Sequence, residues 1–340
     1  MSQDHQKGVT PQWESRPQGL RRLSRCRRVV GTGSYVSQYR EPAMANKYET
    51  ISFLSDYGTR DEFVGVVKSV IYEIAPQSRV VDLTHEIEPF DVRAGSLSLA
   101  RSVSYIASGV VLAVVDPGVG SSRRGVAVEV LDGKGVFVGP DNGLLAMAIA
   151  LAGGAGRAVC LTNTKYHLVS PGETFAGRDI FGPVAAHLCN GVDLSELGEM
   201  IDPALLLPGV VPIPREEKGA LHGEVTWVDR FGNCQLNIGP DEVASMGEVL
   251  RVEIGSLLSG ASASHEQVVR SLKIVRSYDA IGSGLGLVID SYGMLSICVD
   301  RGSAARELSI GQGDLVILSR LTEADQTKSI PTPVKIAPKR

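Results

Sequence analysis

The stretch GVVLAVVDPGVG, residues 109–120, decides the fold class of this chain. It consists of an apolar run that ends at Asp116 and continues into glycines, which is typical of a strand buried on both faces of a parallel sheet. Two strand and helix pairs precede it: ETISFLSD (49–56) with GVVKSVIYEIAP (65–76), and RVVDLTHEI (79–87) with VRAGSLSLARSVSYI (92–106). This alternation predicts an α/β domain with a mainly parallel sheet and helices on both of its faces.

The segments after this strand extend the same domain. GVAVEVLDGKGVFVGPDNG (125–143) predicts a hairpin around Asp132 and Gly133. Further helices are expected from Leu144 and over Asp179–Leu188.

The sequence pattern changes after the prolines between Asp202 and Lys218, and these prolines indicate a linker. Beyond it, short alternating strands separated by Gly, Asn and Ser predict a small, mostly antiparallel barrel or sandwich. We therefore expect five parts: a basic, disordered leader (1–47), an α/β domain (48–202), a linker (203–218), a smaller β-barrel-like domain (219–322) and a flexible tail (323–340).

The charge of the chain is uneven. The sequence carries 34 Lys and Arg against 38 Asp and Glu, and residues 1–47 hold nine of the basic residues but three of the acidic ones. The remaining 25 basic and 35 acidic residues give the body a charge of −10, so it has no basic field to hold a nucleic-acid backbone. The leader's arginines suit a nucleic-acid arm or a transit-like segment, but we favour the simpler interpretation that translation begins at Met44.

Neither a membrane span nor a metal site is predicted. The longest uncharged apolar stretch, Gly143 to Gly156, is shorter than the ~18 residues that indicate a span. The five cysteines are scattered, with no Cys-x-x-Cys pair and no histidine at ligand spacing, so we expect reduced thiols in a cytoplasm.

Polar side chains follow the predicted strands, where ligands bind in open parallel sheets. The positions are Asp56, Asp82 with Thr84 and His85, Asp116, Asp141 with Asn142, and the segment TFAGRD (174–179). Taken singly, each carboxylate has a structural explanation as a helix cap or turn residue, and His85 is expected to be a hydrogen-bonded structural residue. No phosphate-binding loop is predicted, because the glycines at 282, 284 and 286 precede a strand-like segment instead of a helix.

Seven motifs in fixed order change the interpretation of these residues. They are SDYG (55–58), VDLTHEI (81–87), VVDPGVGSSRR (114–124), GPDNGLL (139–145), TFAGRDIFGP (174–183), DRFGNCQLN (229–237) and DRGSAA (300–305). Together they resemble the S-adenosylmethionine hydroxide adenosyltransferases, or S-adenosylmethionine hydrolases, which are relatives of the fluorinases and chlorinases. The resemblance implies an N-terminal α/β domain, a C-terminal β domain, and a homotrimer whose sites lie between the N-terminal domain of one subunit and the C-terminal domain of its neighbour.

The resemblance also implies a reaction and substrate contacts. Water or hydroxide would attack the ribose C5′ of S-adenosyl-L-methionine, giving adenosine and L-methionine without a further cofactor. Asp56 would accept hydrogen bonds from both ribose hydroxyls, and Asp229 and Asn233 would hold the methionine part. The backbone around Ser303 and Ala304 would meet adenine.

The water-handling set of the family hydrolases is incomplete in this chain. Asp116 and Arg123 match two of its members, but the FHGRD of those hydrolases reads FAGRD here, so Ala176 stands at the position of the expected histidine. Alanine offers neither a proton nor a hydrogen bond, and acid or base assistance is worth about 10²- to 10⁴-fold, so we expect an impaired hydrolase. We favour a deliberate His-to-Ala change that keeps the substrate intact; the other explanation is natural drift to a slow hydrolase or a ligand sensor.

Three other functions remain open. A protein that binds S-adenosylmethionine or adenosine without turnover would tolerate Ala176, whereas a halogenase would not need Asp116 and Arg123. Nucleic-acid binding through the leader would weaken steeply with salt and would vanish on removal of residues 1–43. We expect a small-molecule substrate as the partner, and neither nucleic acid nor a membrane.

Overall fold

The structure is a computed structural model that describes residues 47–130, 133–255 and 268–322. The predicted leader up to residue 46, Asp132 of the predicted hairpin and the tail from residue 323 lie outside the described residues.

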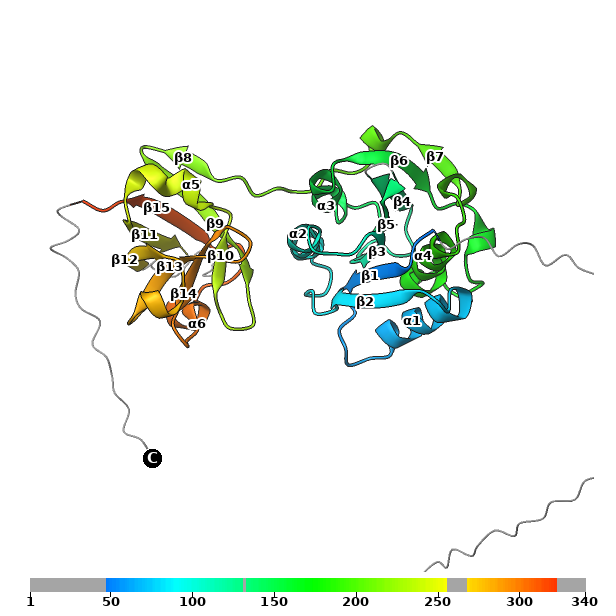
Figure 1. Cartoon of the computed structure of the whole chain (residues 1–340), viewed down its shortest axis with the longest axis horizontal. Helices are drawn as coiled ribbons and strands as arrows, with labels where there is room; N and C mark the ends of the chain where they lie inside the picture. The colour runs from blue at the N-terminus through cyan, green and yellow to red at the C-terminus, as the bar shows by residue number, and fades with distance from the viewer. Residues whose placement is uncertain (1–46, 131–132, 256–267, 323–340) are drawn as a thin grey trace, which may run out of the picture. The chain divides into compact units, whose positions relative to one another are not determined.

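The N-terminal domain is built on a seven-stranded sheet with the strand order β2-β1-β3-β5-β4-β6-β7 (Figure 1). Its strands are β1 (Thr50–Ser55), β2 (Arg79–Thr84), β3 (Gly109–Val114), β4 (Gly125–Val130), β5 (Gly135–Pro140), β6 (Ala155–Cys160) and β7 (Glu199–Ile201). β1 pairs in parallel with β2 and β3, and β3 does so with β5. β4 and β5 form the predicted hairpin, and β6 and β7 extend the sheet with further antiparallel pairings.

Helices cover both faces of this sheet, as the alternating pattern predicts. α1 (Phe63–Ile74) and α4 (Gly182–Cys189) share one buried cluster with Phe53, while α2 (Val92–Ser102) and α3 (Ala146–Leu151) share another with Leu54. Successive side chains of a strand point to opposite faces, so these two fully buried neighbours on β1 enter different clusters. β3 is buried along its whole length, as expected for an inner strand of a sheet that is covered on both sides.

The C-terminal domain is a β-barrel with the strand order β10-β14-β13-β12-β11-β15-β9, closed by pairing of β9 with β10. Its strands are β9 (Ala220–Val228), β10 (Cys234–Leu236), β11 (Val249–Gly255), β12 (Val268–Val275), β13 (Leu285–Ile289), β14 (Leu295–Val299) and β15 (Leu315–Arg320). Within the described residues its pairings are antiparallel apart from β12 with β13, which are parallel. The predicted barrel is confirmed and the sandwich alternative is wrong. The predicted linker contributes β8 (Arg215–Glu217), which pairs with β9.

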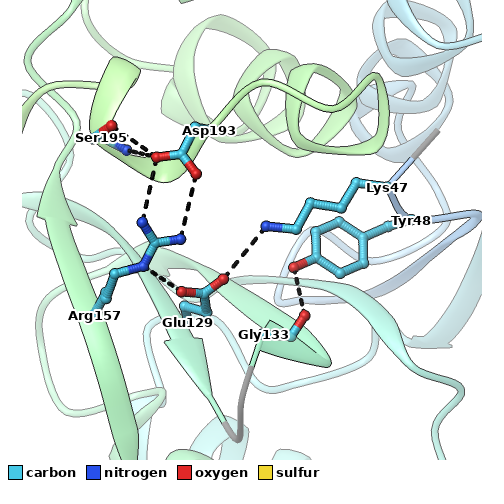
Figure 2. A network of polar contacts seen from close by, with 7 residues as sticks. All are labelled: Lys47, Tyr48, Glu129, Gly133, Arg157, Asp193 and Ser195. Carbon is cyan, nitrogen blue, oxygen red and sulfur yellow. Dashed lines mark hydrogen bonds and ion pairs between the residues drawn. The ribbon is translucent and has the colours of Figure 1, made fainter. Parts of the chain in front are cut away.

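A polar network holds β4, β6 and the segment after α4 together (Figure 2). Glu129 of β4 is 8% exposed and accepts hydrogen bonds from Arg157 Nε at 2.5 Å and from Lys47 Nζ at 3.4 Å. The two terminal nitrogens of Arg157, on β6, lie 3.3 and 3.4 Å from the carboxylate of Asp193. The hydrogen bond from Arg157 lowers the pKa of Glu129, so this buried carboxylate remains ionised at neutral pH.

Candidate functional site

A cavity of about 340 Å³ lies at the carboxyl ends of β1 and β3. These parallel neighbours pair Ser55 with Val114, so the acids that follow them, Asp56 and Asp116, reach the same edge of the sheet. Both carboxylates line the cavity together with Ala176. Its other lining residues are Tyr57, Phe63, Pro89, Phe90, Val114, Val119 and Thr174. The structure therefore brings three of the predicted site positions into one cavity.

Asp56 is held by a backbone hydrogen bond from another lining residue of the cavity. Its Oδ2 accepts the backbone N–H of Phe90 at 2.9 Å, which leaves Oδ1 for another partner. Burial raises the pKa of Asp56, and the hydrogen bond from Phe90 opposes that rise. Phe90 itself has φ of 70° and a side chain that is 70% exposed, so it forms an open aromatic wall.

Asp116 and Arg123 form a two-point ion pair. Arg123 Nε lies 2.9 Å from Asp116 Oδ1, and a terminal guanidinium nitrogen contacts Oδ2. The pair is largely enclosed, with side-chain exposures of 6% for Asp116 and 14% for Arg123. Burial raises the pKa of Asp116 and outweighs the opposing effect of the Arg123 charge. The resemblance pairs these two residues functionally, and the structure joins them directly.

Ala176 stands at the wall between two cavities. It lines the cavity described above and also a second one of about 580 Å³, which is bordered by Arg123, His167 and Asp179. Ala176 immediately precedes η3 (Gly177–Phe181), a π-helix that continues into α4. The predicted helix over this region is present, but its first turn is wound more widely than an α-helix, as often occurs at functional sites.

Tyr57 also lines the cavity, although no role was predicted for it from the sequence. Its hydroxyl packs against Gly177, where an added Cβ would lie 2.2 Å from the phenolic oxygen. The Tyr57 ring is fixed edge-on against Phe175, with ring centroids 5.5 Å apart. A signal was present in the sequence, because Tyr57 follows the predicted ribose-binding Asp56 inside the SDYG motif.

The polar residues at the end of β2 support the site from outside the cavity. His85 is buried, its Nδ1 lies 2.8 Å from Ser55 Oγ, and its Nε2 lies 3.1 Å from Asp82 Oδ1. The backbone N–H of Gly58 donates to the His85 carbonyl at 2.7 Å. His85 is thus a hydrogen-bonded structural residue, as expected, and it fixes the loop that carries Asp56.

Asp141 and Asn142 also have structural contacts, and neither residue lines the cavity that contains Asp56 and Asp116. Asp141 contacts Arg124 and accepts the Leu207 N–H at 2.8 Å. Asn142 Nδ2 donates to the Val115 carbonyl at 2.9 Å, which supports the turn into α3.

The four positions predicted for methionine and adenine gather at one end of the barrel domain. Asp229 Oδ1 accepts the Asn233 N–H at 2.9 Å, and Asn233 Nδ2 donates to Asp229 Oδ2 at 2.8 Å. Gly232 lies between these two and has φ of 86°; a Cβ there would lie 2.0 Å from Ser303 Oγ. Ser303 and Ala304 begin α6 (Ala304–Leu308), whose Ala305 N–H donates to the Gly232 carbonyl at 3.0 Å.

Within the described ranges, no group of three or more His, Cys, Asp or Glu side chains is placed to hold a metal ion. The helices of the same ranges are all too short or too polar to cross a membrane. Cys160, Cys189, Cys234 and Cys298 are free thiols, and Cys26 lies outside the described residues.

Comparison with known proteins matches both domains. The family model of the SAM hydroxide adenosyltransferase N-terminal domain matches residues 51–198, and the family model of the C-terminal domain matches residues 223–317. An (R)-S-adenosyl-L-methionine hydrolase from Salinispora tropica is 40% identical over 265 residues, covering 78% of this chain and 95% of that protein. A fluorinase from an Actinoplanes species is 28% identical over 240 residues, covering 64% of this chain and 80% of that protein.

The fold has a solved counterpart. A crystal structure of an uncharacterized conserved protein from Thermotoga maritima superposes with a TM-score of 0.71 at 35% identity, covering 79% of this chain and all of that one.

Proposed function

Because the chain belongs to the SAM hydroxide adenosyltransferase family, we propose that it hydrolyses S-adenosyl-L-methionine to adenosine and L-methionine. The oxygen of water forms a bond to the ribose C5′, the C5′–S bond breaks, and its electron pair converts the sulfonium to the neutral thioether of methionine. One water proton is released. The reaction requires no redox change, and we propose that it needs no cofactor besides the substrate.

The observation that carries this proposal is the cavity that collects Asp56, Asp116 and Ala176. A sulfonium substrate is cationic, and two acidic side chains, Asp56 and Asp116, line this cavity. The guanidinium of Arg123 holds Asp116 at two points, which fixes the orientation of that carboxylate. Charges that are already oriented can stabilise the transition state without moving during the reaction, which lowers the activation barrier.

We assign the substrate contacts as follows. Asp56 binds the ribose hydroxyls, since Oδ1 remains available while Phe90 occupies Oδ2. Asp229 and Asn233 hold the methionine part, and the backbone at Ser303 and Ala304 meets adenine. Support for the second group is its preassembly: the Asp229 carboxylate fixes Asn233.

We propose that turnover is slow because Ala176 has no group with which to hold or deprotonate water. The loss of an acid or base at this position corresponds to about 10²- to 10⁴-fold in rate. Asp116 and Arg123 remain in place, which favours a hydrolase over a halogenase.

We further propose a homotrimer with sites shared between neighbouring subunits, located in the cytoplasm. The free thiols fit a reducing compartment. Sedimentation equilibrium tests the assembly: a trimer has three times the subunit mass of 36.1 kDa, and a monomeric mass at assay concentration contradicts it.

The decisive experiment for the activity compares this chain with its Ala176→His variant. Each is incubated overnight with S-adenosylmethionine, and adenosine and methionine are followed by chromatography beside an enzyme-free sample and an Asp116→Asn variant. We expect the Ala176→His variant to turn over at least about tenfold faster. Tight binding with no product from either protein would establish a binding protein, and formation of 5′-chloro-5′-deoxyadenosine with added chloride would establish a halogenase.

A further inference from the structure

The attacking water needs a polar partner at the wall formed by Ala176. The polar side chains that line this cavity are Asp56, Tyr57, Asp116 and Thr174. Phe90 holds one oxygen of Asp56, and Arg123 engages both oxygens of Asp116. Thr174 is exposed to solvent, so Tyr57 is the enclosed neutral hydroxyl of the set.

The Tyr57 hydroxyl lies next to the wall. It packs against Gly177, the residue after Ala176, and lies where the side chain of residue 177 would begin. Phe63 and Phe175 contact the Tyr57 ring, with centroid separations of 5.8 and 5.5 Å. Two aromatic neighbours and the close approach to Gly177 therefore fix the position of the phenolic oxygen.

The Tyr57 hydroxyl can both accept and donate hydrogen bonds. A phenol has two lone pairs and one hydrogen, which can serve a partner in the cavity that Tyr57 lines. Burial raises the pKa of Tyr57, and the charges of Asp56 and Asp116 raise it further. The phenol thus stays protonated at neutral pH and keeps both capacities.

We propose that the Tyr57 hydroxyl binds the attacking water beside Ala176 and orients it toward the ribose C5′. This inference rests on the proposed function. The phenolic oxygen accepts one O–H of the water, which leaves a lone pair of the water oxygen free to form the C–O bond. The C5′–S electron pair goes to sulfur, the second water proton passes to solvent, and Tyr57 ends the step with its own proton.

The test uses this chain, Tyr57→Phe, Ala176→His and the double variant, with kcat, KM and the Kd for adenosine measured for each. Tyr166→Phe is the matched control, because its hydroxyl donates to Glu196 at 2.8 Å and does not line the cavity. We expect Tyr57→Phe to lower kcat at least about tenfold, with KM and Kd within about threefold. In the Ala176→His background the same change should cost less than about threefold, because the imidazole then holds the water.

Two results for kcat would overturn the inference while leaving the hydrolase intact. One is an unchanged kcat for Tyr57→Phe, and the other is an equal loss of kcat in both backgrounds. A parallel loss of adenosine binding would show that Tyr57 merely shapes the cavity and would also overturn it. If none of the four proteins forms adenosine, the proposed function itself fails, and this inference falls with it.

Discussion

Asp56 Oδ2 accepts the backbone N–H of Phe90 at 2.9 Å, and Phe90 is held there with φ of 70°. A positive φ costs a residue with a Cβ about 1–2 kcal/mol, so other contacts must maintain it. The Asp56 carboxylate is one such contact. The residue proposed to grip ribose therefore also shapes the aromatic wall of its own cavity.

Asp56→Ala is predicted to weaken substrate binding more than it slows the chemical step. The proposed ribose contacts are the same in the ground and transition states, so their loss appears mainly in KM and Kd. We expect Kd for adenosine to rise at least about tenfold by isothermal titration calorimetry, since hydrogen bonds to a charged group are worth about 1.5–3 kcal/mol. Asp241→Ala, at an exposed position of the barrel domain, is the control, and an unchanged Kd for Asp56→Ala would remove the assignment.

Asp56→Asn is predicted to increase stability at neutral pH while it weakens binding. A carboxyl whose pKa is raised above 3.8 on folding binds its proton more tightly in the folded chain, so stability falls as pH rises through that raised value. Asparagine has no charge to bury and can still accept the Phe90 N–H. We expect a gain of up to about 1 kcal/mol at pH 7 that shrinks toward pH 3, measured by urea unfolding. A variant less stable at pH 7 contradicts this account.

Glu129→Gln is predicted to have the opposite pH signature. The pKa of Glu129 is lowered below 4.5 by Arg157, so its stabilising effect is present above that value and is lost as pH falls through the lowered one. We expect the free energy of unfolding to fall by about 1 kcal/mol at pH 7 and by less at pH 3. The loss at pH 7 is limited because Arg157 is partly exposed. Glu73→Gln, on the exposed face of α1, is the control; equal losses at both pH values would point to packing instead of charge.

Gly177→Ala is predicted to destabilise the site through its contact with Tyr57. The added Cβ would lie 2.2 Å from the Tyr57 hydroxyl, whereas the next nearest ring atom is 3.1 Å away. Overpacking of this kind costs about 1–3 kcal/mol. Adding Tyr57→Phe should recover more than half of the loss, as measured by thermal unfolding; no recovery would show that the strain arises elsewhere in η3.

The sheet was predictable from sequence because its signals are local. The apolar run of β3 and the turn residues between β4 and β5 each specify structure over fewer than about 20 residues. The choice between a barrel and a sandwich could not be predicted from the sequence. It depends on the pairing of β9 with β10, in which Gln235 lies opposite Trp227. Pairings of this kind depend on side-chain packing that short-range patterns do not encode.

The acidic residues of the site could be predicted from the sequence, whereas most of the residues around them could not. Asp56 and Asp116 follow neighbouring strands, and parallel pairing brings such positions together. His85 also ends a strand, yet it turns inward to Ser55, a choice that depends on burial. The π-helix at Gly177 and the approach of the Tyr57 hydroxyl have no local signature, since each results from the packing of segments that are distant in sequence.

The proposed contacts to ribose and water belong to the α/β domain, whereas those to methionine and adenine belong to the barrel. In the proposed trimer, one subunit supplies the first group and its neighbour supplies the second. Two alleles, one damaged at Asp56 and the other at Asn233, would each be inactive alone. Expressed together, they would complement one another, because a mixed trimer can pair an intact α/β domain with an intact barrel.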